Sequence, residues 1–182
     1  IHGTRHAITQ LAQRGIKPDF CVVGEPSSSH HLGDVVRCGR RGSLNGLVTI
    51  KGVQGHVAYP EMVTNPIHTA ALALDALARE IWDDGNAYYP PSSLRSSNIR
   101  SGTGATNVVP GELKAWFNIR FNTEHSDAEL RQRIEEIIHQ HVLDATFVWQ
   151  LSGPPFLTET GALTQAVKEA IRQETSLDAE LS

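Results

Sequence analysis

Nine residues in the second half of the chain alternate strictly in side-chain character, and this pattern constrains the fold more than any other. The apolar positions are Leu113, Ala115, Phe117, Ile119 and Phe121, and the positions between them are Lys114, Trp116, Asn118 and Arg120. A period of two places successive side chains on opposite faces of a β-strand. We therefore predict a strand over 113–121, in a sheet that has one buried face and one polar face.

Two helices are predicted, one before and one after this strand. Asn65 is a good N-cap with Pro66 at the first helical position, and apolar residues recur at helical spacing over 67–81. The segment 126–129, Ser-Asp-Ala-Glu, is a capping box, and one apolar helical face continues from it to His141. Each helix therefore offers an apolar stripe to a sheet.

Three further strand patterns complete the middle of the chain. Residues 44–50 alternate, 93–100 form a weaker candidate, and 145–151 return as a strand before Pro154-Pro155. Residues 42–152 therefore run β-α-β-β-α-β. This order is typical of a ferredoxin-like α+β domain, with a four-stranded antiparallel sheet and both helices on one face.

The flanking segments have the pattern of an α/β protein. Helices are predicted over 4–14 and 161–174, and the apolar run 19–23 predicts a short strand buried on both faces. We predict that 1–41 and 153–182 are two parts of an α/β catalytic domain into which 42–152 is inserted. The chain begins without methionine and stops abruptly, so we expect it to be a fragment.

Composition and charge exclude several classes of function. Sixteen basic and twenty acidic residues give a net charge of −4, without the basic surface that a nucleic-acid binder needs. No apolar run approaches the roughly 20 residues that span a bilayer, and no secretory signal is visible. Cys21 and Cys38 lie in apolar stretches, which predicts reduced, buried thiols in a cytoplasmic protein.

Glu25 is a candidate metal ligand. It directly follows the predicted strand 19–23, at the carboxyl end where open α/β sheets place their ligands. Its carboxylate could bind a metal through oxygen. The alternative is an ordinary residue of a surface turn.

His56 and Asn107 are candidates in two glycine-containing loops. His56 lies in the segment 52–60, where it could donate a hydrogen bond or carry a proton near neutral pH, or have no role. Asn107 lies in the segment 102–111, which lacks the Gly-Lys-Ser/Thr of a phosphate loop. That segment is better explained as a connection between strands, in which Asn107 could supply an amide donor.

Two arginines are candidates for binding an anionic substrate. Arg120 lies on the polar side of the predicted strand 113–121, and Arg40 leads into the central domain. Each guanidinium could bind a carboxylate in bidentate fashion, or each could simply be solvated. The segment 125–127 has the letters of a His-x-Asp metal pair, but Ser126 is better explained as a helix cap. A Gly-x-Ser-x-Gly elbow is absent from the sequence, so a serine hydrolase is not supported.

Five motifs occur in the order seen in the di-zinc family of aminoacylases and carboxypeptidases, which the chain resembles over nearly its whole length. They are Val-Val-Gly-Glu-Pro-Ser at 22–27, Arg-Arg-Gly-Ser at 40–43, the segment 52–60, Thr-Asn-Val-Val-Pro at 106–110 and Phe-Asn-Ile-Arg-Phe at 117–121. The specific part is Gly-His-Val-Ala-Tyr-Pro at 55–60. It is similar to members that remove a succinyl group from an N-succinylated diamino diacid, whereas acetylornithine deacetylases typically carry Gly-His-Ser-Ser there.

This resemblance implies a fold, a cofactor and roles for the candidate residues. The fold would be an α/β domain with two zinc ions, interrupted by a ferredoxin-like domain that mediates homodimerisation. Glu25 would be a zinc ligand, while His56 would reach the active site of the partner subunit and polarise the scissile amide oxygen, assisted by Asn107. Arg120, Arg40 and Tyr59 would hold the carboxylates and chain of the substrate.

The sequence also departs from the family pattern. The His-x-Asp pair, the acidic pair that contains the general base and the late histidine ligand are missing, so we expect the chain to be inactive alone. Two other functions stay open. One is a related N-acyl-amino-acid deacylase or dipeptidase, and the other is a stand-alone ferredoxin-like dimerisation module without catalysis. In none of these do we expect a nucleic-acid or membrane partner.

Overall fold

A computed structural model describes residues 3–182, and the chain divides into two compact units. Unit 1 comprises Ile1–Cys38 and Glu159–Ser182, and unit 2 comprises Gly39–Thr158. Each unit is described by itself. Within the described part of the chain, no helix is long and apolar enough to cross a membrane.

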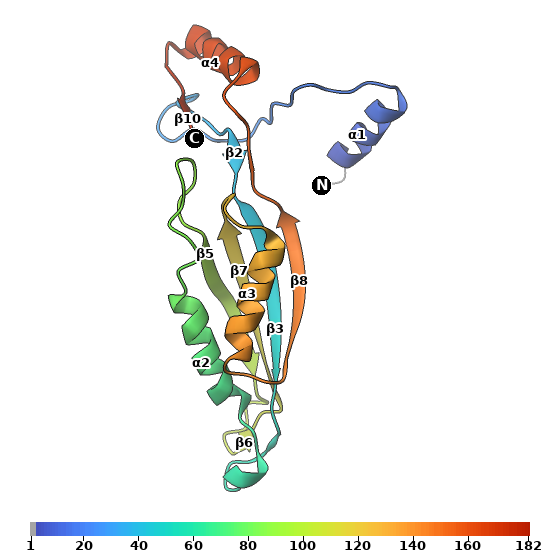
Figure 1. The fold of residues 1–182 in the computed structure, drawn as a ribbon, viewed down its shortest axis with the longest axis vertical. Helices are drawn as coiled ribbons and strands as arrows, with labels where there is room; N and C mark the ends of the chain where they lie inside the picture. Colours follow the sequence, from blue (N-terminus) through green and yellow to red (C-terminus); the bar gives the residue numbers. More distant parts are fainter. Residues whose placement is uncertain (1–2) are drawn as a thin grey trace. The chain divides into compact units, whose positions relative to one another are not determined.

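Unit 2 is built on a four-stranded antiparallel sheet with the strand order β5-β7-β3-β8 (Figure 1). The strands are β3 (Gly42–Lys51), β5 (Ser93–Ser101), β7 (Glu112–Phe121) and β8 (Ala145–Gly153). β3 pairs with β7 from Gly42↔Phe121 to Lys51↔Glu112, so these two strands form the centre of the sheet. The strand predicted over 113–121 is confirmed and lies within β7.

Two helices pack on one face of this sheet (Figure 1). α2 (Pro66–Arg79) begins after Asn65, whose side chain accepts a hydrogen bond from the Ile67 N–H at 2.9 Å. α3 (Asp127–His139) begins with a reciprocal capping box between Ser126 and Glu129. Both predicted starts are therefore confirmed, because each was fixed by a local side-chain hydrogen bond.

The core of unit 2 lies between the helices and the apolar face of the sheet. Phe117, Phe121 and Ile134 are among its fully buried side chains. The alternation in β7 means that Asn118 and Arg120 point to the opposite face, which α2 and α3 do not cover. That face is therefore free to carry polar side chains.

Short elements occupy the two ends of unit 2. At one end β4 (Gly55–His56) pairs with β6 (Val108–Val109), followed by the 3₁₀ helix η1 (Pro60–Met62). At the other end β2 (Gly39–Arg40) pairs with β9 (Phe156–Leu157). We call this second pair the connecting ribbon, because one boundary between the units lies directly before β2 and the other lies one residue after β9.

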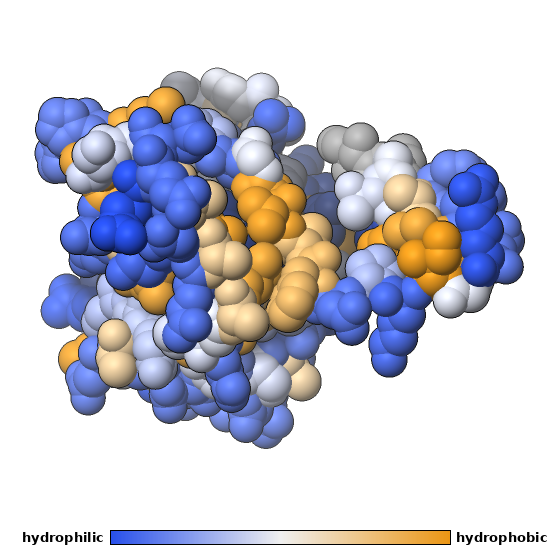
Figure 2. Space-filling view, turned by 90° about the horizontal axis from the view of Figure 1, so that it is seen from above, coloured by the Kyte–Doolittle hydropathy of each residue, from blue (hydrophilic) through white to orange (hydrophobic). Residues whose placement is uncertain are grey.

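Unit 1 contains α1 (Gly3–Gln13), α4 (Ala162–Thr175) and a parallel pair of β1 (Val35–Val36) with β10 (Glu180–Leu181). The strand predicted over 19–23 is wrong, because the segment has no strand partner and its apolar side chains Phe20, Val22 and Val23 are exposed. Cys21 is likewise exposed and Cys38 half-buried, so the expectation of buried thiols is also wrong, although both are free cysteines. Figure 2 shows that apolar residues do reach the surface of the chain.

Candidate functional site

His56 lies at the end of unit 2 that the β4–β6 pair forms. Gly55 pairs with Val109 and His56 with Val108, and the Val57 N–H donates to the Asn107 carbonyl at 3.0 Å. A Cβ at Gly52 would collide with the Thr64 carbonyl, so the close approach of the backbone after β3 to the segment just before α2 requires glycine at position 52. The pairing brings His56 and Asn107 together from segments about 50 residues apart.

The imidazole of His56 is oriented by its neighbours. Its Nδ1 accepts a hydrogen bond from the Ala58 N–H at 3.1 Å, and its Nε2 lies 3.4 Å from Nδ2 of Asn107. An acceptor at Nδ1 places the proton of the neutral ring on Nε2, and turning the Asn107 amide over would present its oxygen to that proton. The ring of Tyr59 lies 6.0 Å from the His56 ring, centroid to centroid. All three side chains are exposed, so this His56 group can contact a ligand or a second protein chain.

The two arginines lie together at the opposite end of the sheet. Arg120 pairs with Ser43, and Ser43 pairs with Gly153 on the next strand. The guanidinium of Arg40 lies directly over Gly153, at the place where a side chain on that residue would be. Arg40 and Arg120 therefore share the uncovered face of the sheet, and Gly153, over which the Arg40 guanidinium lies, is two strand spacings from Arg120, about 10 Å between backbones. Two guanidinium groups on one sheet face can each bind a carboxylate of a substrate.

Asn118 organises the middle of this arginine end. Its Nδ2 lies 3.0 Å from Ser43 Oγ, 3.3 Å from the Leu44 carbonyl and 2.9 Å from Asn45 Oδ1. These bonds tie β7 to β3 through side chains as well as backbone. Sequence reasoning missed Asn118 and Ser43, although a polar residue two positions before Arg120 on the same strand face was a visible signal.

The His56 group and the arginine end are far apart within one chain. On β3, eight residue steps lead from Ser43, beside Arg120, to Lys51, after which the His56 loop begins. At the rise of an extended strand this is about 27 Å. A small substrate bound by Arg120 therefore cannot touch His56 of the same chain.

Glu25 lies in unit 1 and is exposed. Among residues 3–182, no three His, Cys, Asp or Glu side chains come close enough together to hold a metal ion. A zinc ion in a protein normally has at least three protein ligands. The described residues therefore do not fit a zinc ion by themselves.

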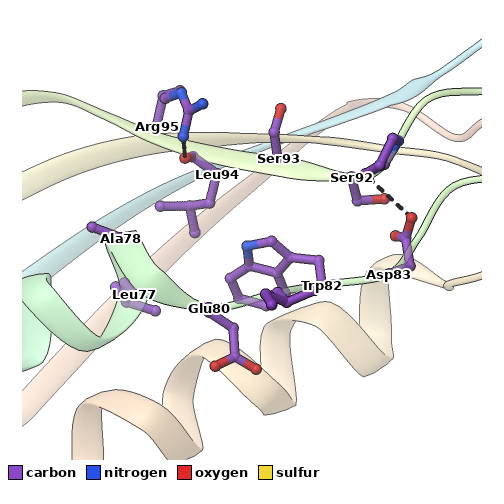
Figure 3. Close-up of a pocket in the computed structure, with 11 residues that line it drawn as sticks. Leu77, Ala78, Glu80, Trp82, Asp83, Ser92, Ser93, Leu94 and Arg95 are labelled. Carbon is purple, nitrogen blue, oxygen red and sulfur yellow. Dashed lines mark hydrogen bonds between the residues drawn. The ribbon is translucent and has the colours of Figure 1, made fainter.

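A cavity of about 230 Å³ opens between the end of α2 and the start of β5 (Figure 3). Trp82, Asp83, Ser92 and Arg95 are among its lining residues, and Asp83 accepts a hydrogen bond from Ser92. Burial raises the pKa of Asp83, but hydrogen bonds from Ser92, Gly85 and Asn122 outweigh burial and lower it. None of the predicted site residues lines this cavity, and the hydrogen bonds of Asp83 give it a structural role.

Comparison with known families and structures identifies the class of this chain. Residues 38–146 match the M20 peptidase dimerisation domain. The chain therefore belongs to the family of peptidase dimerisation domains.

Curated relatives give a narrower comparison. The chain is 53% identical over 172 residues to a succinyl-diaminopimelate desuccinylase of Alkalilimnicola ehrlichii, covering 94% of this chain and 46% of the relative. It is 55% identical over 181 residues to the succinyl-diaminopimelate desuccinylase of Pseudomonas fluorescens, covering 100% of this chain and 47% of the relative. The chain thus spans about half the length of the relatives it matches.

Solved structures support the fold. A tripeptidase from Staphylococcus aureus superposes with a TM-score of 0.64 at 18% identity, over 81% of this chain and 39% of that one. An M20 family metallo-carboxypeptidase from Sulfolobus solfataricus gives a TM-score of 0.64 at 12% identity, over 79% and 45% of the two chains. At these identities the likeness concerns the fold alone.

Proposed function

We propose that this chain is part of a zinc-dependent amide hydrolase that cleaves N-succinyl-LL-2,6-diaminopimelate to succinate and LL-diaminopimelate, a step of lysine and diaminopimelate biosynthesis. The observation that carries the proposal is the separation of about 27 Å between the His56 group and the arginine end. If both act on one substrate, the active site combines residues of two copies of the chain. Identities of 50–55% to curated desuccinylases support this choice of substrate.

The arginine end would bind the substrate. N-succinyl-diaminopimelate carries several carboxylates, and the guanidinium groups of Arg120 and Arg40 can each form bidentate hydrogen bonds to one of them. Their place on the uncovered face of the sheet leaves them accessible. Tyr59, which lies beside His56, would contact the substrate chain from the other copy.

His56 would act on the scissile amide across the dimer. Its Nε2–H, beside Asn107, is the one N–H donor of a neutral ring whose Nδ1 is engaged by Ala58. Directed at the amide oxygen, this donor stabilises the negative charge that develops there in the transition state. Asn107 would hold the ring or share the same oxygen. A donor oriented before the substrate arrives loses little free energy to reorganisation during the reaction.

Glu25 is the one residue that we assign to zinc binding. Bound zinc would supply an activated water and polarise the carbonyl, with two ions in the complete enzyme. We propose Glu25 as one carboxylate ligand, with the others supplied by parts of the protein outside this chain. The steps assigned above to His56, Asn107 and the arginines do not depend on that assignment.

The proposed organisation is one domain inserted into another. We assign 42–152 to a ferredoxin-like dimerisation and lid domain, supported by the strand order and the two helices on one face. We assign 1–41 and 153–182 to parts of an α/β catalytic domain. Exposed apolar residues in unit 1, among them Phe20, Val22 and Val23, support this assignment because such surface normally packs against further structure.

The same domain carries a surface suited to a homodimer. β5 is an edge strand of the sheet, so one side of its backbone has no strand partner among residues 3–182. Beside it, α2 and the residues after it expose Leu72 and Ile81, and β5 itself exposes Ile99. An unpaired strand edge flanked by apolar side chains favours edge-to-edge pairing with a second copy.

Mixed dimers test the proposal. In the complete enzyme that carries this chain, His56→Ala and Arg120→Ala are each expected to abolish most succinate release as homodimers. A dimer with one subunit of each variant keeps one intact site, so random reassortment restores about a quarter of the wild-type activity. Mixing each variant with itself is the control. Failure of the mixture to regain activity, with mixed dimers shown to form, would refute catalysis by His56 across the dimer.

Substrate choice needs a separate measurement. Succinate release from N-succinyl-diaminopimelate is compared with acid release from other N-acyl amino acids and from dipeptides. A higher kcat/KM for the succinylated diamino diacid supports the proposal. A preference for a dipeptide or for an N-acetyl amino acid would refute the proposed substrate and assign the enzyme a different activity within the family.

A further inference from the structure

The hydroxyl of Tyr89 lies against the connecting ribbon formed by β2 and β9. The side chain comes from the loop between α2 and β5, is only 8% exposed, and donates a hydrogen bond to the Phe156 carbonyl at 2.6 Å. A Cβ at Gly39 would collide with this hydroxyl and with the same carbonyl. Tyr89 therefore contacts both strands of the ribbon, and glycine at position 39 makes room for it.

The loop that carries Tyr89 is itself held in place. Oδ1 of Asn86 accepts hydrogen bonds from the N–H groups of Tyr88 and Tyr89 at 3.0 and 2.9 Å. Nδ2 of Asn86 donates to Thr123 and Glu124, just before α3. The tyrosine ring therefore projects from a hydrogen-bonded loop of unit 2.

The ribbon in turn sets the place of Arg40. Arg40 is the β2 residue that pairs with Phe156, the residue whose carbonyl Tyr89 holds. From there its guanidinium reaches over Gly153, which pairs with Ser43 beside Arg120. A shift of the ribbon would carry Arg40 away from Arg120, whereas Arg120 is fixed in the central strand β7.

We propose that Tyr89 is a positioning residue for Arg40. By holding the Phe156 carbonyl, its hydroxyl keeps the connecting ribbon against the loop between α2 and β5 and keeps the Arg40 guanidinium over Gly153, on the sheet face that carries Arg120. This rests on the substrate-binding role proposed above for Arg40.

The test compares Tyr89→Phe with Tyr88→Phe. Tyr88 is the exposed neighbour on the same loop, and its backbone N–H bonds to the same Asn86 oxygen as that of Tyr89. It is therefore a matched control. In the 182-residue chain, Tyr89→Phe is expected to speed hydrogen exchange at the backbone amides of β2 and β9 about three- to tenfold, the size of one lost hydrogen bond. Tyr88→Phe should leave them unchanged. Unchanged exchange in Tyr89→Phe would overturn the proposal.

A second readout separates positioning from simple stability. In the complete enzyme, Tyr89→Phe should raise KM for the succinylated substrate about three- to tenfold and leave kcat near wild type. In an Arg40→Ala background the same change should add no further increase in KM, because the residue that Tyr89 positions is gone. Additive effects of the two substitutions would overturn the positioning role. Succinate release by the wild-type enzyme and the mixed dimers test the proposed function independently of this result.

Discussion

Asp83 is expected to be one of the most sensitive polar positions for the stability of unit 2. It lies between α2 and β5 with 9% of its side chain exposed. Its Oδ1 accepts hydrogen bonds from Gly85 N at 2.8 Å, Ser92 N at 3.1 Å and Asn122 Nδ2 at 2.7 Å. Its Oδ2 lies 3.5 Å from Nε2 of His125. One carboxylate therefore joins the loop after α2 to the start of β5 and to the end of β7.

The expected cost follows from the number of donors left without a partner. Asp83→Ala leaves three N–H groups without a hydrogen-bond acceptor, one of them on the fully buried Asn122. Each unpaired group lowers the free energy of unfolding by about 1–3 kcal/mol. Water can reach some of them, so we expect a total loss of about 3–5 kcal/mol in the free energy of unfolding. Asp83→Asn keeps an acceptor oxygen but loses the charge that strengthens each bond, so we expect about 1–2 kcal/mol.

The pH dependence has a definite sign. Hydrogen bonding holds the pKa of Asp83 below its ordinary value in the folded chain. A carboxyl group with a lowered folded pKa stabilises the fold at pH values above its unfolded pKa of about 4, and this contribution is lost as the pH falls through the folded pKa. The advantage of the wild type over Asp83→Asn is therefore full near neutral pH and shrinks in acid.

Urea unfolding followed by tryptophan fluorescence measures these differences, since Trp82 is buried next to Asp83. Asp84→Ala, on the exposed neighbour, is the control and should change stability by no more than about 0.5 kcal/mol. A loss below about 1 kcal/mol for Asp83→Ala would contradict the reasoning from unpaired donors. So would a wild-type advantage over Asp83→Asn that stays constant in acid.

Two further predictions concern local hydrogen bonds. Ser126→Ala removes the side-chain half of the capping box of α3 and should lower the free energy of unfolding by about 1 kcal/mol in the same urea experiment, with Ser126→Asp retaining most of it. The N–H groups of His31, His30 and Ser29 bind the Asp34 carboxylate and lower its pKa to about 2. Asp34→Ala should therefore speed hydrogen exchange at these three amides, and in the wild type the same faster exchange should appear only as the pH falls towards about 2. Unchanged exchange in Asp34→Ala would count against this reasoning.

Elements fixed by local chemistry were predictable from the sequence. The alternation over 113–121 identified β7, and the caps at Asn65 and Ser126 identified the starts of α2 and α3. In each case neighbouring residues carry the determining interaction. The apolar run 19–23 looks like a strand by the same local test, yet it has no strand partner among the described residues and is exposed. A strand depends on pairing with a distant segment, which a short stretch of sequence cannot reveal.

The arrangement of the candidate site was less predictable. The resemblance implied that Asn107 assists His56, but their approach to 3.4 Å comes from the pairing of two-residue strands that have no pattern of their own. Tyr89 looked like any aromatic residue of a loop, and its contact with Phe156 joins positions 67 residues apart. Polar contacts between distant loops have no periodicity, so they become visible only in three dimensions.

The unpaired edge of β5 also bears on how the chain behaves before it finds a partner. Exposed strand edges can recruit any extended segment, and uncontrolled recruitment leads to aggregation. Residues 95–101 are Arg-Ser-Ser-Asn-Ile-Arg-Ser, so two charged side chains and several small polar ones accompany one isoleucine. Such a sequence is a poor template for amyloid-like stacking, because like charges would repeat at every layer. The strand can therefore remain open in a newly made chain while still allowing association with a matching copy.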